Sequence, residues 1–187
     1  SVSNETKEVL SSLQKLGHKI IINTARNFVR TKELIDLLKP DYTVINAGGY
    51  ILDKDLKPIK DKTMSKELTN AIVMDAYQYT KNISIQTKDY LYTTDPNSKY
   101  IHDTYYDISN GCYLESYKIL PCHLPIEIGE EIAKKNGVYF VNYFGGKWSR
   151  FAENDATKLE ALKYIVAYDG GNMSDTISFG DDYGDIS

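Results

Sequence analysis

The stretch Lys19-Ile20-Ile21-Ile22-Asn23 constrains the fold of this chain more than any other. A short, continuous apolar run of this kind is typical of a parallel β-strand buried on both faces. Its neighbours along the chain are a predicted helix at 6–16 with Ser3 or Asn4 as its cap, a helix at 27–38 and a strand at 42–45. The order helix, strand, helix, strand predicts a doubly wound, Rossmann-like parallel sheet.

The sequence changes character after this first α/β segment. The predicted elements are a hairpin of 50–52 with 56–59, a helix at 65–80, antiparallel strands within 83–120, a helix at 125–135 and a hairpin of 138–141 with 148–151. An α/β pattern then returns, with a helix capped by Asp155 and a strand at 176–179. We therefore predict an α/β core interrupted by an α+β insertion, with residues 1–59 and 155–187 forming the core and residues 60–154 the insertion.

Composition narrows the classes of protein that fit. A net charge of −4 with no basic stripe argues against nucleic acid as a partner. No apolar run approaches the roughly 20 residues of a membrane span, and no signal peptide is visible. Cys112 and Cys122 fit a reducing compartment, so we expect a soluble cytoplasmic protein. Cys122-His123 resembles half a zinc site, but no second ligand pair stands at a suitable spacing.

Polar residues follow several predicted strands or open a predicted helix. They are Thr24, Arg26, Asn46, Lys158, Asp181 and Asp185. In open α/β sheets, ligands bind outside the carboxyl ends of the strands. A hydroxyl, a lysine and an acidic loop that holds a hard cation such as Mg²⁺ together form the set that stabilises a phosphoryl group.

Each of these residues also has a simpler interpretation. Thr24 can merely end a strand, and Lys158 can be a solvated lysine in the first turn of a helix, where the helix dipole disfavours a cation. The acidic residues at the end of the chain can form a solvated turn. The many tyrosines of the insertion suit a sugar-binding surface, but tyrosine also simply favours strands.

In this order, the motifs resemble those of the haloacid dehalogenase superfamily, and most closely its Cof-type phosphatases. The family's second motif is similar to Ile20–Arg26, its asparagine-glycine turn to Asn46–Gly49, its third-motif lysine to Lys158, and its fourth motif to Gly180–Asp185. The resemblance spans the whole chain, and the family's α+β cap domain corresponds to the insertion. It implies a Mg²⁺-dependent phosphatase that acts on a small phosphorylated metabolite through an aspartyl-phosphate intermediate.

The resemblance also implies a role for each matching residue. Thr24 and Lys158 would be catalytic and hold the phosphoryl oxygens, together with Asn46. Arg26 would touch the substrate or form a structural ion pair. The metal would be bound by Asp181 and Asp185.

The sequence departs from the family pattern at three places. Ala25 replaces the usual glycine, and Gly184 replaces an asparagine of the metal shell. The first motif, Asp-x-Asp on the central strand, would supply the nucleophile and has no counterpart at its expected place. We therefore expect this sequence to be part of a longer chain, with the missing strand lying between the strands at 19–23 and 176–179.

Three alternatives remain open at this stage. A non-catalytic relative would bind a phosphorylated ligand without turning it over. A flavodoxin-like binding domain would hold no metal at its carboxylates. A phosphomutase of the same superfamily would differ from a phosphatase only in its cap.

Overall fold

A computed structural model describes residues 2–98 and 103–180, which divide into two compact units. The split unit combines residues 1–61 with residues 157–187, and the inserted unit covers residues 62–156. The split unit contains α1 (Asn4–Lys15), β1 (Ile21–Asn23), α2 (Phe28–Leu38), β2 (Tyr42–Ile45), the 3₁₀ turn η1 (Asn46–Gly48), β3 (Tyr50–Asp53), β4 (Pro58–Asp61), α5 (Lys158–Tyr168) and η3 (Met173–Asp175).

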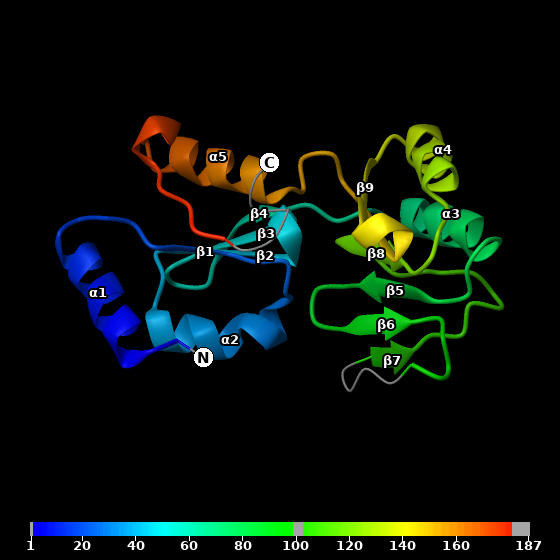
Figure 1. Cartoon of the computed structure of the whole chain (residues 1–187), viewed down its shortest axis with the longest axis horizontal. Coiled ribbons are helices and arrows are strands. Elements are labelled where there is room, and N and C mark those ends of the chain that lie inside the picture. Colours follow the sequence, from blue (N-terminus) through cyan, green and yellow to red (C-terminus); the bar gives the residue numbers. More distant parts are fainter. Residues whose placement is uncertain (1, 99–102, 181–187) are drawn as a thin grey trace. The chain divides into compact units, whose positions relative to one another are not determined.

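The sheet of the split unit has the order β1-β2-β3-β4. β1 and β2 are parallel, whereas the β3–β4 hairpin is added antiparallel to β2. The predicted parallel pairing therefore applies to β1 with β2, and the hairpin extends the same sheet. Figure 1 shows α2 and α5 on opposite sides of this sheet.

Helices on both faces explain why every residue of β2 is buried. On one face, Tyr42 and Val44 pack against Ala161 and Ile165 of α5. Because successive strand side chains point to opposite faces, Thr43 and Ile45 face the α2 side. The predicted helix–strand–helix–strand order is confirmed, with Ser3 and Asn27 as the N-caps of the two helices.

Two predictions for the last part of the split unit are wrong. Thr157, not Asp155, caps α5, because its hydroxyl accepts a hydrogen bond from the backbone N–H of Glu160. Residues 176–179 form no strand, and Ile177 and Phe179 are 80% and 92% exposed. Within the described ranges, no strand pairs with residues 176–179, so their backbone takes no part in a sheet.

The inserted unit is a six-stranded sheet with two helices. Its elements are α3 (Lys66–Tyr77), β5 (Ile83–Gln86), β6 (Leu91–Thr93), β7 (Asp103–Tyr105), β8 (Lys118–Pro121), α4 (Ile126–Asn136), β9 (Tyr139–Tyr143), η2 (Phe144–Gly146) and β10 (Trp148–Ala152). The strand order is β7-β6-β5-β8-β10-β9. All pairs are antiparallel, as predicted, except that β6 and β7 are parallel.

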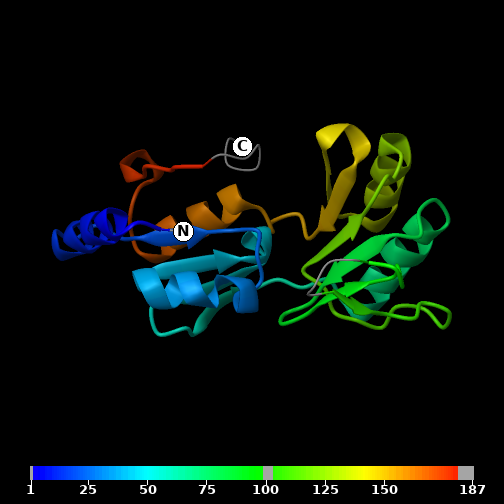
Figure 2. The same ribbon diagram turned by 60° about the horizontal axis from the view of Figure 1, so that its bottom comes forward.

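Both helices of the inserted unit pack on one face of its sheet, as Figure 2 shows. The core there joins Ile72 of α3 and Ile132 of α4 to Ile85, Ile119 and Phe151 of the strands. Cys112 and Cys122 are free and buried, and burial raises the pKa of both thiols. None of the described helices is long and apolar enough to span a membrane.

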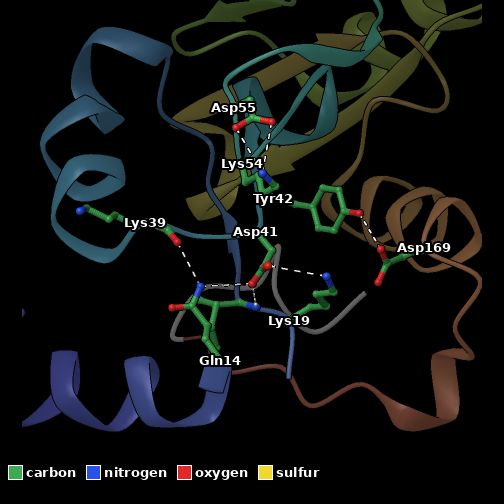
Figure 3. Close-up of polar contacts among 9 residues, drawn as sticks. Gln14, Lys19, Lys39, Asp41, Tyr42, Lys54, Asp55 and Asp169 are labelled. Carbon is green, nitrogen blue, oxygen red and sulfur yellow. Dashed lines mark hydrogen bonds and ion pairs between the residues drawn. The ribbon is translucent and has the colours of Figure 1, made fainter. Parts of the chain in front are cut away.

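A polar cluster holds the amino-terminal ends of β1 and β2 (Figure 3). The Asp41 carboxylate accepts hydrogen bonds from the backbone N–H of Ile20 at 2.9 Å and from Nε2 of Gln14 at 3.2 Å. Next to it, the Tyr42 hydroxyl donates to Asp169, the C-cap of α5, at 2.7 Å. Burial, and then this bond to Asp169, raise the pKa of Tyr42 to about 12. These contacts fasten α1 and α5 to the same end of the sheet.

Replacing Tyr42 with Phe is expected to lower the free energy of unfolding by about 1–3 kcal/mol near neutral pH, because a hydrogen bond to a charged carboxylate is lost. The folded-state pKa lies above the ordinary value of about 10. The contribution of the phenol is therefore fully present below about pH 10 and is lost as the pH rises toward about 12. Urea titrations should show a difference between wild type and Tyr42→Phe that is constant at about pH 7–9 and shrinks above pH 10. A difference that stays constant up to about pH 11 would contradict this account.

Candidate functional site

The carboxyl ends of β1 and β2 bring two predicted site residues to the same sheet edge. The register pairs Asn23 with Val44, so both parallel strands end side by side. Immediately beyond, the Thr24 N–H donates to the Val44 carbonyl at 2.9 Å, and the Thr24 carbonyl accepts from the Ala47 N–H at 3.1 Å. These backbone bonds fix Thr24 beside the turn that begins at Asn46.

The start of α5 meets the same edge. The Asn23 Nδ2 donates to the Lys158 carbonyl at 3.0 Å. Gly48 has φ +108°, and a Cβ placed there would lie 2.2 Å from the Thr157 carbonyl oxygen. Only glycine allows the turn after β2 to lie this close to the first residues of α5. Lys158, the first residue of α5, is thereby held next to the strand ends, and its side chain is half-buried.

Thr24 and Arg26 form a short turn between β1 and α2. The Thr24 hydroxyl oxygen accepts from the Arg26 N–H at 3.2 Å, and the Arg26 carbonyl accepts from the Asn46 N–H at 2.8 Å. The hydroxyl shapes the turn in this way and still has its own hydrogen to donate. The guanidinium of Arg26 is exposed and makes no ion pair with any described residue, so the structural ion pair considered from the sequence is not formed in this part of the chain.

Asn46 carries the clearest sign of a ligand at this edge. It is 1% exposed, and neither Oδ1 nor Nδ2 has a hydrogen-bond partner. Its φ of +53° and that of Ala47, +60°, place two successive non-glycine residues in the left-handed region, which is costly and is found most often at functional sites. Each buried polar group left unpaired costs about 1–3 kcal/mol. A bound water or ligand would remove that cost.

Asn23 is a residue of this site that the sequence reasoning missed. It donates from Nδ2, but its Oδ1 is buried without a partner. The only signal in the sequence is its position, since it is the polar residue that ends the apolar run of β1. The two amides, Asn23 and Asn46, thus leave three polar atoms unsatisfied at one sheet edge.

The predicted metal ligands, Asp181 and Asp185, lie outside the described residues. Among the residues that are described, no group of three histidine, cysteine, aspartate or glutamate side chains is arranged to hold a metal ion. The described part therefore brings Thr24, Asn46 and the start of α5 to one sheet edge and contains no metal shell.

The chain contains one Asp-x-Asp sequence, Asp53-Lys54-Asp55, and it serves the hairpin between β3 and β4. The Asp53 carboxylate accepts from the N–H groups of Asp55 and Lys57 at 2.9 and 2.8 Å, and Asp55 pairs with Lys54 at 3.3 Å (Figure 3). Asp53 pairs with Tyr42, at the end of β2 opposite Asn46. This motif is structural and lies away from the candidate site.

Comparison with known proteins now decides the family. The model of the haloacid dehalogenase-like hydrolases matches residues 1–187. The chain belongs to this family. The predicted α/β fold with an inserted unit is thereby confirmed, and so is the resemblance to the superfamily. A search of curated protein sequences finds no match.

Solved structures share the fold at low sequence identity. A haloacid dehalogenase-like hydrolase from Bacteroides thetaiotaomicron is 15% identical with a TM-score of 0.80, and the match covers 99% of this chain and 77% of that one. A second protein of that species, described among the phosphatases of the superfamily, is 15% identical with a TM-score of 0.81, covering 100% and 72%. A sugar phosphatase of subclass IIB is 17% identical with a TM-score of 0.72, covering 99% and 75%.

Replacing Gly48 with Ala is expected to destabilise the protein by at least about 2–3 kcal/mol, because the new methyl group combines a left-handed φ with a backbone clash. Gly170→Ala is the matched control, since Gly170 has φ +72° but no atom within 4 Å of the added Cβ. The Gly170→Ala control should lower the free energy of unfolding by only about 1–2 kcal/mol. Urea denaturation of both variants measures the difference. Equal losses in the two variants would show that the contact with Thr157 does not constrain the site.

Proposed function

We propose that this hydrolase is a phosphatase that removes phosphate from a small phosphorylated metabolite, with sugar phosphates as the first candidates. The observation that carries the proposal is the convergence of Thr24, Asn46 and Lys158 at one sheet edge, beside buried amide atoms that lack partners. The description of a structurally similar protein as a subclass IIB sugar phosphatase supports the choice of substrate class.

In this proposal, each residue of the edge contributes to binding the phosphoryl group. The Thr24 hydroxyl donates to one phosphoryl oxygen. The Lys158 ammonium neutralises another, and the phosphate in turn offsets the unfavourable position of a cation at a helix N-terminus. The Asn46 amide satisfies its buried donor with the same anion, and Arg26, exposed on the adjacent turn, contacts the rest of the substrate. Such preorganised donors stabilise the charge that develops in phosphoryl transfer.

The proposal assigns Mg²⁺ to Asp181 and Asp185, where it would neutralise charge on the phosphoryl oxygens. The reaction class implies an aspartyl-phosphate intermediate. No residue of this sequence is assigned as its nucleophile, since Asp53 and Asp55 are committed to the hairpin. The inserted unit, about residues 60–154, would act as the cap that selects the substrate, and a cytoplasmic location is part of the same proposal.

Because no residue of this sequence is assigned as the nucleophile, one alternative function is also favoured. A relative that binds phosphorylated ligands without hydrolysing them would use Thr24, Asn46 and Lys158 in the same way. Both functions predict that the protein binds phosphate, but only the phosphatase turns its substrate over. One set of variants therefore tests both.

In a chain that carries the first-motif aspartate, we expect hydrolysis of p-nitrophenyl phosphate to require Mg²⁺, to stop with excess EDTA and to return when Mg²⁺ is restored. Lys158→Ala should lower kcat/KM by about 10²–10³-fold, the usual loss when one charge-stabilising group is removed. Thr24→Val should lower kcat/KM by about tenfold or more. Lys163→Ala is the matched control on the same helix, because the exposed Lys163 pairs only with Glu160 on the surface. Its activity should match that of wild type.

Two results would overturn the phosphatase proposal. One is full activity in Lys158→Ala. The other is an absence of turnover in a protein that binds inorganic phosphate through Lys158 in calorimetry, which would establish the non-catalytic alternative.

A further inference from the structure

The sheet of the inserted unit ends at β9 (Tyr139–Tyr143), which is its outer strand on one side. Within the described residues, β9 pairs with β10 and with no other strand. In an antiparallel sheet, alternate residues of a strand direct both their N–H and their C=O groups away from the paired neighbour. The outer edge of β9 therefore presents backbone donors and acceptors that a further strand could pair with.

The other outer strands of the two described sheets are protected against such pairing. Natural edge strands are blocked by shortness, charge, proline or a β-bulge. In the split unit, β4 carries Pro58, Lys60 and Asp61, and a register shift interrupts its pairing with β3. The remaining two, β1 and β7, have three residues each. By contrast, β9 has five residues without a charge or a proline, and its five pairs with β10 are in continuous register.

The packing of β9 holds this edge in a fixed conformation. The ring of Phe140 lies 5.0 Å from that of Phe151, measured between centroids. The Asn142 side chain donates from Nδ2 to the Ser149 hydroxyl at 3.1 Å and accepts from the Gly146 N–H at 2.8 Å. Every residue of β9 is half-buried. A strand that is already ordered loses little conformational entropy when it associates.

The sequence of β9, Tyr-Phe-Val-Asn-Tyr, is complementary to itself. Because side chains alternate between the faces of a sheet, Tyr139, Val141 and Tyr143 share one face and are symmetric about Val141. When two identical strands pair antiparallel about a two-fold axis, one residue opposes its own counterpart. With Val141 on that axis, all five residues overlap and Tyr139 of each copy opposes Tyr143 of the other. Aromatic and β-branched pairs of this kind stabilise a sheet.

We propose that two copies of this chain associate through β9, which pairs antiparallel with β9 of the second copy about a two-fold axis at Val141. A second copy fits this edge because the strand is uncharged and self-complementary. Since both copies use the same edge, the contact closes at two chains. The association does not depend on the phosphatase proposal, because all of its residues belong to the inserted unit.

Cross-linking of Val141→Cys tests the register directly. Residues that oppose each other across two strands have Cβ atoms about 4.5–5.5 Å apart, close to the separation in a disulfide. Oxidation of the whole protein with diamide should therefore link most chains into dimers, which non-reducing electrophoresis detects and dithiothreitol reverses. The native Cys112 and Cys122 are buried. Tyr105→Cys is the matched control, because Tyr105 lies on β7 at the opposite edge of the same sheet and is 53% exposed. It should remain largely unlinked.

Charged variants test the two-fold symmetry. Sedimentation equilibrium should give twice the mass of the chain for wild type. Val141→Lys and Val141→Glu each place like charges opposite one another across the axis, so each should weaken the dimer by about tenfold or more. An equimolar mixture of the two variants should recover the dimer, because opposite charges then face each other. A folding defect, or an effect of Arg150 beside position 141 on β10, would not be reversed by mixing.

Three results would overturn the proposal. They are a wild-type protein that stays monomeric up to its highest soluble concentration, a dimer that survives in both charged variants, and equal cross-linking of Val141→Cys and Tyr105→Cys. If the charged variants fail to fold, the comparison of the two cysteine variants decides the matter.

Discussion

The structure of the split unit depends on the contact between Gly48 and Thr157. The Thr157 carbonyl oxygen occupies the space that any side chain at position 48 would need. This contact joins a turn that precedes the inserted unit to a helix that follows it. Because the closest atoms are backbone atoms on both sides, a side chain at position 48 would push the turn and the start of α5 apart. The position of Lys158 beside the strand ends follows from this one steric constraint.

The two ends of the short β1–β2 pair differ in how completely their polar groups are satisfied. At the amino-terminal end, Asp41 accepts hydrogen bonds from Ile20 and Gln14, and Tyr42 donates to Asp169. At the carboxyl-terminal end, the amides of Asn23 and Asn46 leave buried atoms without partners. The first arrangement stabilises the fold by itself, whereas the second is stable only with a further partner. This asymmetry is the basis for proposing that the carboxyl-terminal end of the sheet binds a ligand.

The inserted unit repeats this contrast on its own sheet. The face under α3 and α4 is apolar and tightly packed, with Phe140 lying against Phe151 at a ring-centroid distance of 5.0 Å. On the opposite face, the guanidinium carbon of the buried Arg150 lies 5.2 Å from the ring centroid of Tyr139, and its Nε has no hydrogen-bond partner among the described residues. Relatives of 15–17% identity share the fold but little of the sequence.

The sequence by itself determined the elements whose signals are local. The apolar runs of β1 and β2, the cap of the first helix at Ser3, and the order of Thr24, Asn46 and Lys158 along the chain are all readable from neighbouring residues. Hydrogen bonds within four residues and apolar periodicity are sufficient for these predictions.

Only the tertiary structure decided which segments find partners. Residues 176–179 have strand-forming side chains but no neighbouring strand in the described chain, so they stay exposed. β6 and β7 pair in parallel although their local pattern is that of a meander. The burial of the Asn23 Oδ1 atom and of Arg150 follows from residues distant in sequence, and no local pattern encodes it. Strand pairing and the desolvation of a polar group are long-range properties, and for that reason the unpaired amide atoms at the sheet edge became visible only in three dimensions.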